Sequence, residues 1–496
     1  MMRVLLLLFI MFEVGFSASY RDGHKALRAK NYAKAAADFW EVSKSQKDKK
    51  LRVKAEWGLA ESLRGLELYQ SASRYYTKHV RRGPQSPYFR RSLQRLGSIH
   101  ADVGLGQSHI VRMFREKVNP SQIPGKARGF YFYFSGSEAF HRRQLEKARS
   151  LFTRVQRSSE YYLRARFYLG VISNLSGRSR KAIEIFDAVS REAPRTRNGN
   201  WLRQQSILNI ARVYYELGQY RDAIRYYSRI HRDESVWLNA LFESAWAFYL
   251  MEKPSNTLGN IHTIHSPYFS HRFFPETHIL KAVTFLKGCH FQRVKKSIDD
   301  FHDNFKPVSK DLDRVLKRYR KKPRQFFELI NKFKSGRLSQ YKNAKQIFDA
   351  LGRTDSWVQG EMTIRSVNDE LRRLRSTPSR WRKTKLTLAL KKFLVTKKSL
   401  AIKDSASRLY VNALSFRRYL TELSGQTRLI KAEMLLGKVD SLRAKVTGAT
   451  VRSKVGYVGG LKEVTSGEKL EFWPFQGEYW EDELGWYVYN IKDKCR

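Results

Sequence analysis

Cysteine and acidic residues are scarce in this chain, and both shortages limit what it can be. Its two cysteines, Cys289 and Cys495, are too few for a disulfide-built scaffold. An oxidising compartment would permit a bridge, but a lone buried Cys289 is the simpler expectation. Asp and Glu number 46 against 95 Lys and Arg, a net charge of +49. Such a surface attracts polyanions, although a generally basic proteome gives the same charge without a specific partner.

Long apolar runs are also missing after the first residues, so no later segment is expected to cross a membrane. The stretch 1–19 predicts a secretory signal peptide. Arg3 supplies its positive end, Val4–Phe12 its apolar run, and Ser17 and Ser19 a small-residue cleavage pair. We therefore expect an exported, periplasmic protein with no transmembrane span after cleavage. A buried first helix is the alternative interpretation.

The motifs of common enzymes are absent from the sequence, which has no phosphate-binding glycine loop, nucleophile elbow or zinc-protease motif. Exported helical solenoids that cleave peptidoglycan need a Glu-Ser pair and a later Gly-Leu-Met-Gln-type motif. The pairs at Glu61 and Glu243 fall in repeat helices, and no such motif follows. His262 and His265 lack further metal ligands. We expect no enzyme and no cofactor, with peptidoglycan cleavage as a remote alternative.

A helical repeat is the clearest pattern that is present. Ala148 and Ala182 lie 34 residues apart, and each is followed four residues later by a phenylalanine, Phe152 and Phe186. Small residues let two antiparallel helices touch, and aromatic residues fill the space beside them. The same pattern recurs less regularly elsewhere, and the sequence predicts an all-α tetratricopeptide-repeat solenoid over residues 20–309. Such repeats bind other proteins far more often than they catalyse reactions.

Partner contacts are expected on the first helix of each central repeat, where exposed polar and aromatic residues follow the helical register. The surface would bind a segment of a partner protein on its concave side. The residues that we assign to it are Arg166, Asn174, Asn209, Arg212 and Tyr215.

A basic helical region follows the repeats, at residues 310–446. Within it, residues 371–403 hold 12 Lys and Arg and no acidic residue, while apolar residues keep helical spacing. Helix breaks are expected near Pro323, Gly352, Gly360 and Pro378. This region predicts, as an alternative function, binding of anionic membrane lipid, lipopolysaccharide, peptidoglycan or nucleic acid, although a signal peptide argues against nucleic acid. The cations assigned to such binding are Arg372, Arg373, Arg375, Arg380, Arg382, Lys383 and Lys385.

The last segment, residues 447–496, changes character again because it is acidic and aromatic. Lys469–Phe475 and Trp486–Ile491 predict two short strands, and hence a small C-terminal β element. Its aromatic residues could dock a partner or fold back as a cap on the basic helices, with acids facing Lys and Arg. The cap is favoured, since exposed aromatics promote aggregation. The residues concerned are Trp473, Tyr479, Trp480 and Trp486.

Three segments go beyond the general repeat pattern: Ser244–Ala247, His265–Phe269 and Gly477–Gly485. They resemble the periplasmic tetratricopeptide-repeat proteins of the adventurous gliding motility system of myxobacteria and their relatives in predatory bacteria. The resemblance implies a non-enzymatic scaffold that binds envelope proteins within a multiprotein complex, with no catalytic residue to carry over.

Overall fold

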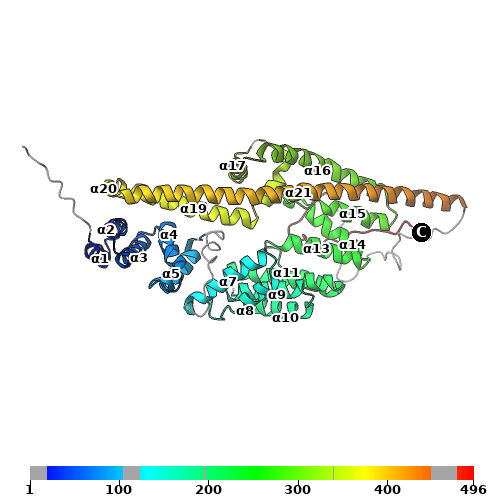
Figure 1. Ribbon diagram of the computed structural model, residues 1–496. Coiled ribbons are helices and arrows are strands. Elements are labelled where there is room, and N and C mark those ends of the chain that lie inside the picture. The colour runs from blue at the N-terminus through cyan, green and yellow to red at the C-terminus, as the bar shows by residue number, and fades with distance from the viewer. Residues whose placement is uncertain are drawn as a thin grey trace, which may run out of the picture. The chain divides into compact units, whose positions relative to one another are not determined.

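The computed structural model describes residues 19–103, 105, 123, 125–194, 197–338, 340–447 and 477–495. All regular secondary structure in these residues is helical, which confirms the predicted all-α class but not the predicted small C-terminal β element (Figure 1). The predicted signal peptide lies outside them, apart from Ser19. No helix in the described part of the chain is both long and apolar enough to cross a membrane. The helices are α1 (Tyr20–Arg28), α2 (Tyr32–Ser45), α3 (Lys49–Gly65), α4 (Tyr69–Arg81), α5 (Phe89–Val103), α7 (Gly125–His141), α8 (Leu145–Thr153), α9 (Tyr162–Leu175), α10 (Ser179–Glu192), α11 (Arg197–Glu216), α12 (Tyr220–Tyr227), α13 (Trp237–Leu250), α14 (Pro254–Ile264), η2 (Pro267–Phe269), α15 (Glu276–Lys287), α16 (Phe291–Tyr319), α17 (Pro323–Lys334), η3 (Lys342–Ala344), α18 (Lys345–Leu351), α19 (Asp355–Ser376), α20 (Ser379–Arg382) and α21 (Lys385–Thr447).

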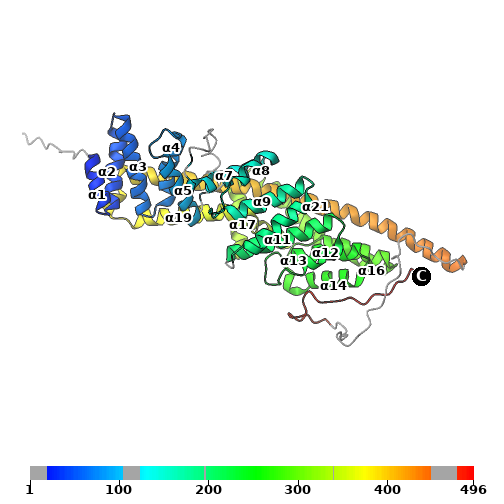
Figure 2. The same cartoon turned by 90° about the horizontal axis from the view of Figure 1, so that it is seen from below.

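The chain divides into two compact units. The first unit consists of residues 1–127 and 361–401, and the second of residues 128–360 and 402–496. Each unit therefore combines repeat helices with part of the C-terminal helical region. In the second unit, α9 to α14 are stacked one after another (Figure 2).

Small residues of the repeat pattern lie where successive helices touch. A Cβ atom on Gly170 of α9 would lie 2.7 Å from the ring of Phe186 on α10. A Cβ atom on Gly58 of α3 would likewise lie 2.6 Å from the ring of Phe39 on α2. The repeat alanines are fully buried beside these rings, Ala182 among them. Removal of the Cβ lets one helix approach the aromatic side chain of the next, which is why this spacing predicts helix pairs.

One expected helix break, at Gly360, is wrong, and Pro307 does not end a helix either. Helix α16 continues through Pro307 and has 29 residues in total. Proline removes one helical hydrogen bond, and the apolar residues on both sides of it, from Phe301 to Leu316, remain buried and keep the helix packed. Gly360, an expected break, lies inside α19, where a Cβ would come within 1.8 Å of the Ser405 hydroxyl. Its role is therefore close packing rather than termination.

In the second unit, α21 packs against α16 in the opposite direction. Tyr410 donates from its hydroxyl to the Leu316 carbonyl over 3.0 Å, and Thr427 lies 3.1 Å from the His302 ring nitrogen. Further along, the ring of Phe291 lies 3.2 Å from the position of a Cβ on Gly437. Residues later in α21 thus contact residues earlier in α16, so the two long helices form an antiparallel pair.

The segment Gly477–Cys495 is a turn and extended chain without a strand, so the predicted strand at Trp486–Ile491 is wrong. Its backbone groups bond to helices instead of to a second strand. The Tyr489 N–H donates to the Ser255 carbonyl and the Lys494 N–H to the Gly288 carbonyl, each over 3.1 Å. These bonds pair two backbone N–H groups of the extended segment. The partner strand predicted at 469–475 lies outside the described residues.

Candidate functional site

The candidate interaction surface is formed by the first helices of the central repeats, α9, α11 and α13. Polar side chains bridge neighbouring helices along this row. Asn174 on α9 donates from its amide nitrogen to the Glu216 carboxylate on α11 over 2.7 Å. Arg212 on α11 makes a two-pronged ion pair with Glu243 on α13, over 2.9 and 2.6 Å. Hydrogen-bonded polar groups therefore connect three successive repeats.

A tyrosine completes the cluster around Glu243. Tyr227, on the second helix α12, donates its hydroxyl proton to the Glu243 carboxylate over 3.1 Å. It occupies the aromatic position four residues after the repeat alanine Ala223. Burial raises the pKa of Tyr227 well above its ordinary value, and the Glu243 carboxylate adds to the rise. The phenol thus remains a proton donor at any physiological pH.

The first unit contains a second cluster of one tyrosine, one glutamate and one arginine. In it, the glutamate lies on the helix before the tyrosine and the arginine on the helix after it. Tyr76 on α4, four residues after Ala72, donates to Glu61 on α3. Arg95 on α5 pairs with that carboxylate through two bonds of 3.0 Å. Here the glutamate precedes the tyrosine in the chain and the arginine follows it, whereas the order around Tyr227 is reversed. Sequence analysis missed both clusters, although tyrosine in place of phenylalanine at the repeat position was a usable signal.

The remaining residues that we assigned to partner binding lie on the same helices and are half-buried. Asn209 donates to the Gln205 carbonyl of its own helix over 2.8 Å. The ring of Tyr215 meets that of Tyr220 edge-on, with centroids 5.5 Å apart. Arg166 lies on α9. Arg212 is engaged by Glu243, so its guanidinium already has a partner within the fold. Partner binding by these five residues stays a prediction.

The cations assigned to polyanion binding lie on α19, α20 and the start of α21, in the first unit. Two of them are paired: Arg372 with Asp369 and Arg373 with Glu67. The side chain of Arg380 lies outside the described part of the structure. The other members of the set are exposed, and they are Arg375, Arg382, Lys383 and Lys385. Four cations therefore remain accessible for an anionic partner, and this role too stays a prediction.

A buried carboxylate attaches α19 to the repeats of the first unit. Glu370 is 3% exposed and accepts hydrogen bonds from the backbone N–H groups of Gln70 and Ser71 and from the Ser71 hydroxyl. These N–H groups belong to the first turn of α4, which has no capping side chain of its own. Burial raises the pKa of Glu370 to about 7, while the bonds from Ser71 and Gln70 oppose the rise. Nothing in the local sequence indicated this contact.

Two further contacts secure the same helices. The Trp381 indole N–H donates to the Ala33 carbonyl at the start of α2 over 2.9 Å. The Arg74 guanidinium of α4 lies 4.8 Å from the centroid of the Phe393 ring on α21. The basic helices of this unit are therefore packed parts of the repeat stack rather than free cationic arms.

The acidic tail folds back on the repeats, not on the basic helices as expected. The ring of Tyr479 stacks on His262 of α14 at 4.8 Å, and Tyr487 meets the same imidazole edge-on. Gly259 makes this approach possible, since a Cβ there would lie 1.7 Å from the Tyr487 carbonyl oxygen. The expected pairing of tail acids with Lys and Arg is replaced by aromatic and backbone contacts with α14.

Two of the other tail aromatics that we singled out are not buried in the core. Trp480 is 59% exposed and Trp486 is 81% exposed, while Trp473 lies outside the described residues. The turn that carries the two exposed rings is held by its backbone. Arg232 donates to the Glu481 carbonyl over 2.8 Å, and the Gly485 N–H donates to the Thr263 hydroxyl over 3.0 Å.

Cys289 and Cys495 form a disulfide, with Cα atoms 5.0 Å apart, so the expectation of a lone Cys289 is wrong. Residues 206 positions apart meet because the tail returns to the end of α15. The His290 ring nitrogen lies 2.6 Å from the Lys492 carbonyl beside the bridge. In the described residues, no group of three His, Cys, Asp or Glu side chains is placed to hold a metal ion.

Comparison with known proteins gives little. No protein-family model matches the chain. No curated protein matches it either. Among solved structures, the apo form of RapI is similar at 15% identity, over 67% of this chain and 96% of that one, with a TM-score of 0.32. A likeness at this level carries no statement about function.

Proposed function

We propose that this protein is a non-enzymatic scaffold that binds partner proteins through the first helices of its central repeats. The observation that carries the proposal is the row of half-buried polar and aromatic side chains on α9, α11 and α13, fixed from helix to helix by Asn174–Glu216 and Arg212–Glu243. A fixed row of partly exposed groups suits recognition of an extended or helical segment, because little side-chain entropy is lost on binding.

The proposal places the protein in the cell envelope. Two features support export: the apolar stretch after Arg3, and the Cys289–Cys495 bridge, since disulfides persist in oxidising compartments such as the periplasm. The resemblance of Gly477–Gly485 to gliding-motility proteins suggests a multiprotein envelope complex as the setting. Partners would be envelope proteins.

The binding test uses the full mature chain as bait in envelope extracts. Replacement of Arg166, Asn209 and Tyr215 by alanine should reduce recovery of specific partners about tenfold, because these side chains lie on the proposed surface. The matched control replaces Arg180 and Arg221, exposed residues of the second helices α10 and α12, and should leave recovery unchanged. Equal recovery with both variants would reject the surface.

Export is tested separately by cell fractionation of the full chain and of a chain without residues 1–19. We expect the full chain in the periplasmic fraction and the shortened chain in the cytoplasm. A cytoplasmic full chain would contradict the envelope assignment and would favour nucleic acid as the partner.

A second candidate function is polyanion binding by the exposed cations of α19 to α21. The specific observation in its favour is that Arg375, Arg382, Lys383 and Lys385 are exposed. They lie on helices that contact the repeats of the same unit through Glu370 and Trp381. Binding to lipopolysaccharide or anionic vesicles should then fall steeply as salt rises from low to physiological concentration. Flat binding over that range would exclude this function.

A further inference from the structure

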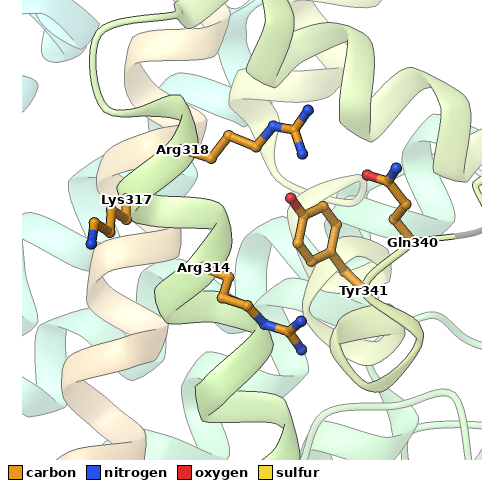
Figure 3. A pocket seen from close by; sticks show the side chains of 5 residues that line it. All are labelled: Arg314, Lys317, Arg318, Gln340 and Tyr341. Atoms are coloured by element: carbon orange, nitrogen blue, oxygen red, sulfur yellow. The ribbon is translucent and has the colours of Figure 1, made fainter.

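We propose that a pocket between α16 and the loop before η3 binds a phosphomonoester. The pocket has a volume of about 640 Å³ and is lined by Arg314, Lys317, Arg318, Gln340 and Tyr341 (Figure 3). This inference goes beyond the proposed scaffold function, because the pocket lies in the second unit away from the first helices of the central repeats.

The cations come from one face of α16. Positions 314, 317 and 318 have the spacing that places helical side chains side by side. Figure 3 shows the guanidinium groups of Arg314 and Arg318 extending on either side of Tyr341, with the Gln340 amide beyond the ring, while the Lys317 ammonium points away from it. Arg314 and Arg318 are therefore the direct ligands, and Lys317 adds to the positive field.

A buried carboxylate fixes both walls of the pocket. Asp311 is 1% exposed and pairs with Arg314 from the same helix. It also accepts hydrogen bonds from the backbone N–H and the side-chain amide of Asn343, each over 3.1 Å. Asp311 thus orients the arginine and holds the loop against α16. Such support for a ligand by a second residue is what a preformed site requires.

The loop wall has an unusual backbone. Tyr341 has φ 56° and ψ 46°, the left-handed region that a residue with a side chain adopts at a cost of about 1–2 kcal/mol. This conformation turns the Tyr341 ring toward α16, between the two guanidinium groups (Figure 3). A glycine would relieve the strain but would supply neither ring nor hydroxyl, so the conformation is consistent with a role for the side chain.

The charge of the site selects the ligand class. Three cations and one carboxylate leave about two positive charges, which match a phosphomonoester at roughly −1.5 to −2 near neutral pH. A ligand with a single carboxylate would neutralise only half of the site's positive charge. Two arginines can each form paired N–H bonds to phosphate oxygens, and Gln340 and Tyr341 can bond to a neighbouring hydroxyl. A volume of this size accommodates a headgroup or a small sugar phosphate.

The test measures binding of glycerol 3-phosphate to the full mature chain by calorimetry, at physiological salt. Saturable binding is expected, and the variant Arg314→Gln/Arg318→Gln should weaken it at least tenfold. The matched control, Arg320→Gln/Lys321→Gln, removes two exposed cations from the adjoining helix end and should change the affinity less than twofold. Equal weakening in both variants, or no saturable binding of either glycerol 3-phosphate or vesicles that contain phosphatidic acid, would overturn the proposal.

A second arm separates the two sources of a phosphomonoester. Phosphatidylcholine vesicles with and without phosphatidic acid are compared with the soluble probe. Binding to both probes that depends on Arg314 and Arg318 supports a site open to soluble ligands, and binding to phosphatidic acid vesicles alone with the same dependence supports a lipid headgroup. If vesicle binding is unchanged in the variant Arg314→Gln/Arg318→Gln, the proposed site is wrong. Circular dichroism of each variant checks that the helices are intact.

Discussion

At the residue scale, the aromatic residue four positions after each repeat alanine has two structural roles. Where it is phenylalanine, as in Phe152 and Phe186, it fills the space left by a small residue on the facing helix. Where it is tyrosine, as in Tyr76 and Tyr227, it also bonds to a glutamate that pairs with an arginine on a neighbouring helix. One hydroxyl therefore converts an apolar packing position into part of a charged bridge between repeats.

We expect Tyr227→Phe to lower the free energy of unfolding by about 1 kcal/mol, because the Glu243 carboxylate loses a partly buried hydrogen bond. Tyr220→Phe is the matched control, since its partly exposed hydroxyl is not part of the Glu243 cluster, and it should change stability by less than about 0.5 kcal/mol. Urea unfolding followed by circular dichroism measures both. Equal midpoints for the two variants would contradict the role of the hydroxyl.

Gly170→Ala should destabilise the protein by about 1–3 kcal/mol, since the new Cβ would lie 2.7 Å from the Phe186 ring. Gly425→Ala offers a control in a helix, because no atom lies within 4 Å of its Cβ position. That substitution should be neutral or stabilise by up to about 1 kcal/mol through helix propensity. Thermal unfolding of both variants tests the prediction, which fails if they shift in the same direction.

At the element scale, helix ends are capped by distant parts of the chain. The first turn of α4 is bonded by Glu370 of α19, a residue 300 positions later in the sequence. A carboxylate at a helix N-terminus is favoured by the helix dipole, but burial opposes its ionisation, and the charge of Lys397 offsets that effect only in part. The result is a group that titrates near neutral pH inside the first unit.

This cap predicts a pH dependence with a definite sign. The pKa of Glu370 is raised to about 7 in the folded chain from 4.5, so between these values the folded state binds more protons than the unfolded state. Its contribution to stability is therefore present below about pH 4.5 and is lost as pH rises to about 7, by at most about 3 kcal/mol. Glu370→Gln should remove this part of the dependence.

The measurement is urea unfolding of the natural chain and of Glu370→Gln at pH 5, 6, 7 and 8, and the difference between the two isolates this carboxyl from other titrating groups. Glu328→Gln, on the exposed side of α17, serves as the control and should run parallel to the natural chain. A constant difference between the natural chain and Glu370→Gln across the range would show that Glu370 does not titrate there.

At the scale of the whole molecule, the chain's end is tied back to the last repeats. The disulfide, the bond from Tyr489 to Ser255 and the stacking of Tyr479 on His262 all hold the tail on α14 and α15. This arrangement places the tail against α14 and the end of α15.

Reduction of the bridge, or Cys495→Ser, should lower the melting temperature of the mature chain. A loop of 206 residues places the expected loss at up to roughly 5 kcal/mol. Cys289→Ser should have the same effect, and dithiothreitol should have none on either variant. Scanning calorimetry checks this, and limited proteolysis should then remove the tail first. An unchanged melting temperature would mean that the bridge does not stabilise the attachment of the tail.

The fold could be predicted from the sequence to the extent that it depends on local pattern. Alanine and aromatic spacing around Ala148 and Ala182 fixes helix pairs, because each helix must bury one face against its neighbour, and the periodicity of that face is written in consecutive residues. The candidate surface on α9 and α11 followed from the same register. The strand at Trp486–Ile491 was wrong because tertiary contacts decide whether a segment with strand propensity becomes a strand, and here the Tyr489 N–H bonds to Ser255 of α14.

By itself, therefore, the sequence determined the helical repeats, the basic surface and the positions of the small residues, all of which depend on neighbours along the chain. Only the tertiary structure decided which distant groups meet: Glu370 with α4, Arg212 with Glu243, Cys289 with Cys495, and the tail with α14. Such contacts are selected by burial and by the need to satisfy buried polar groups in the packed molecule, and neither is encoded in any one stretch of residues.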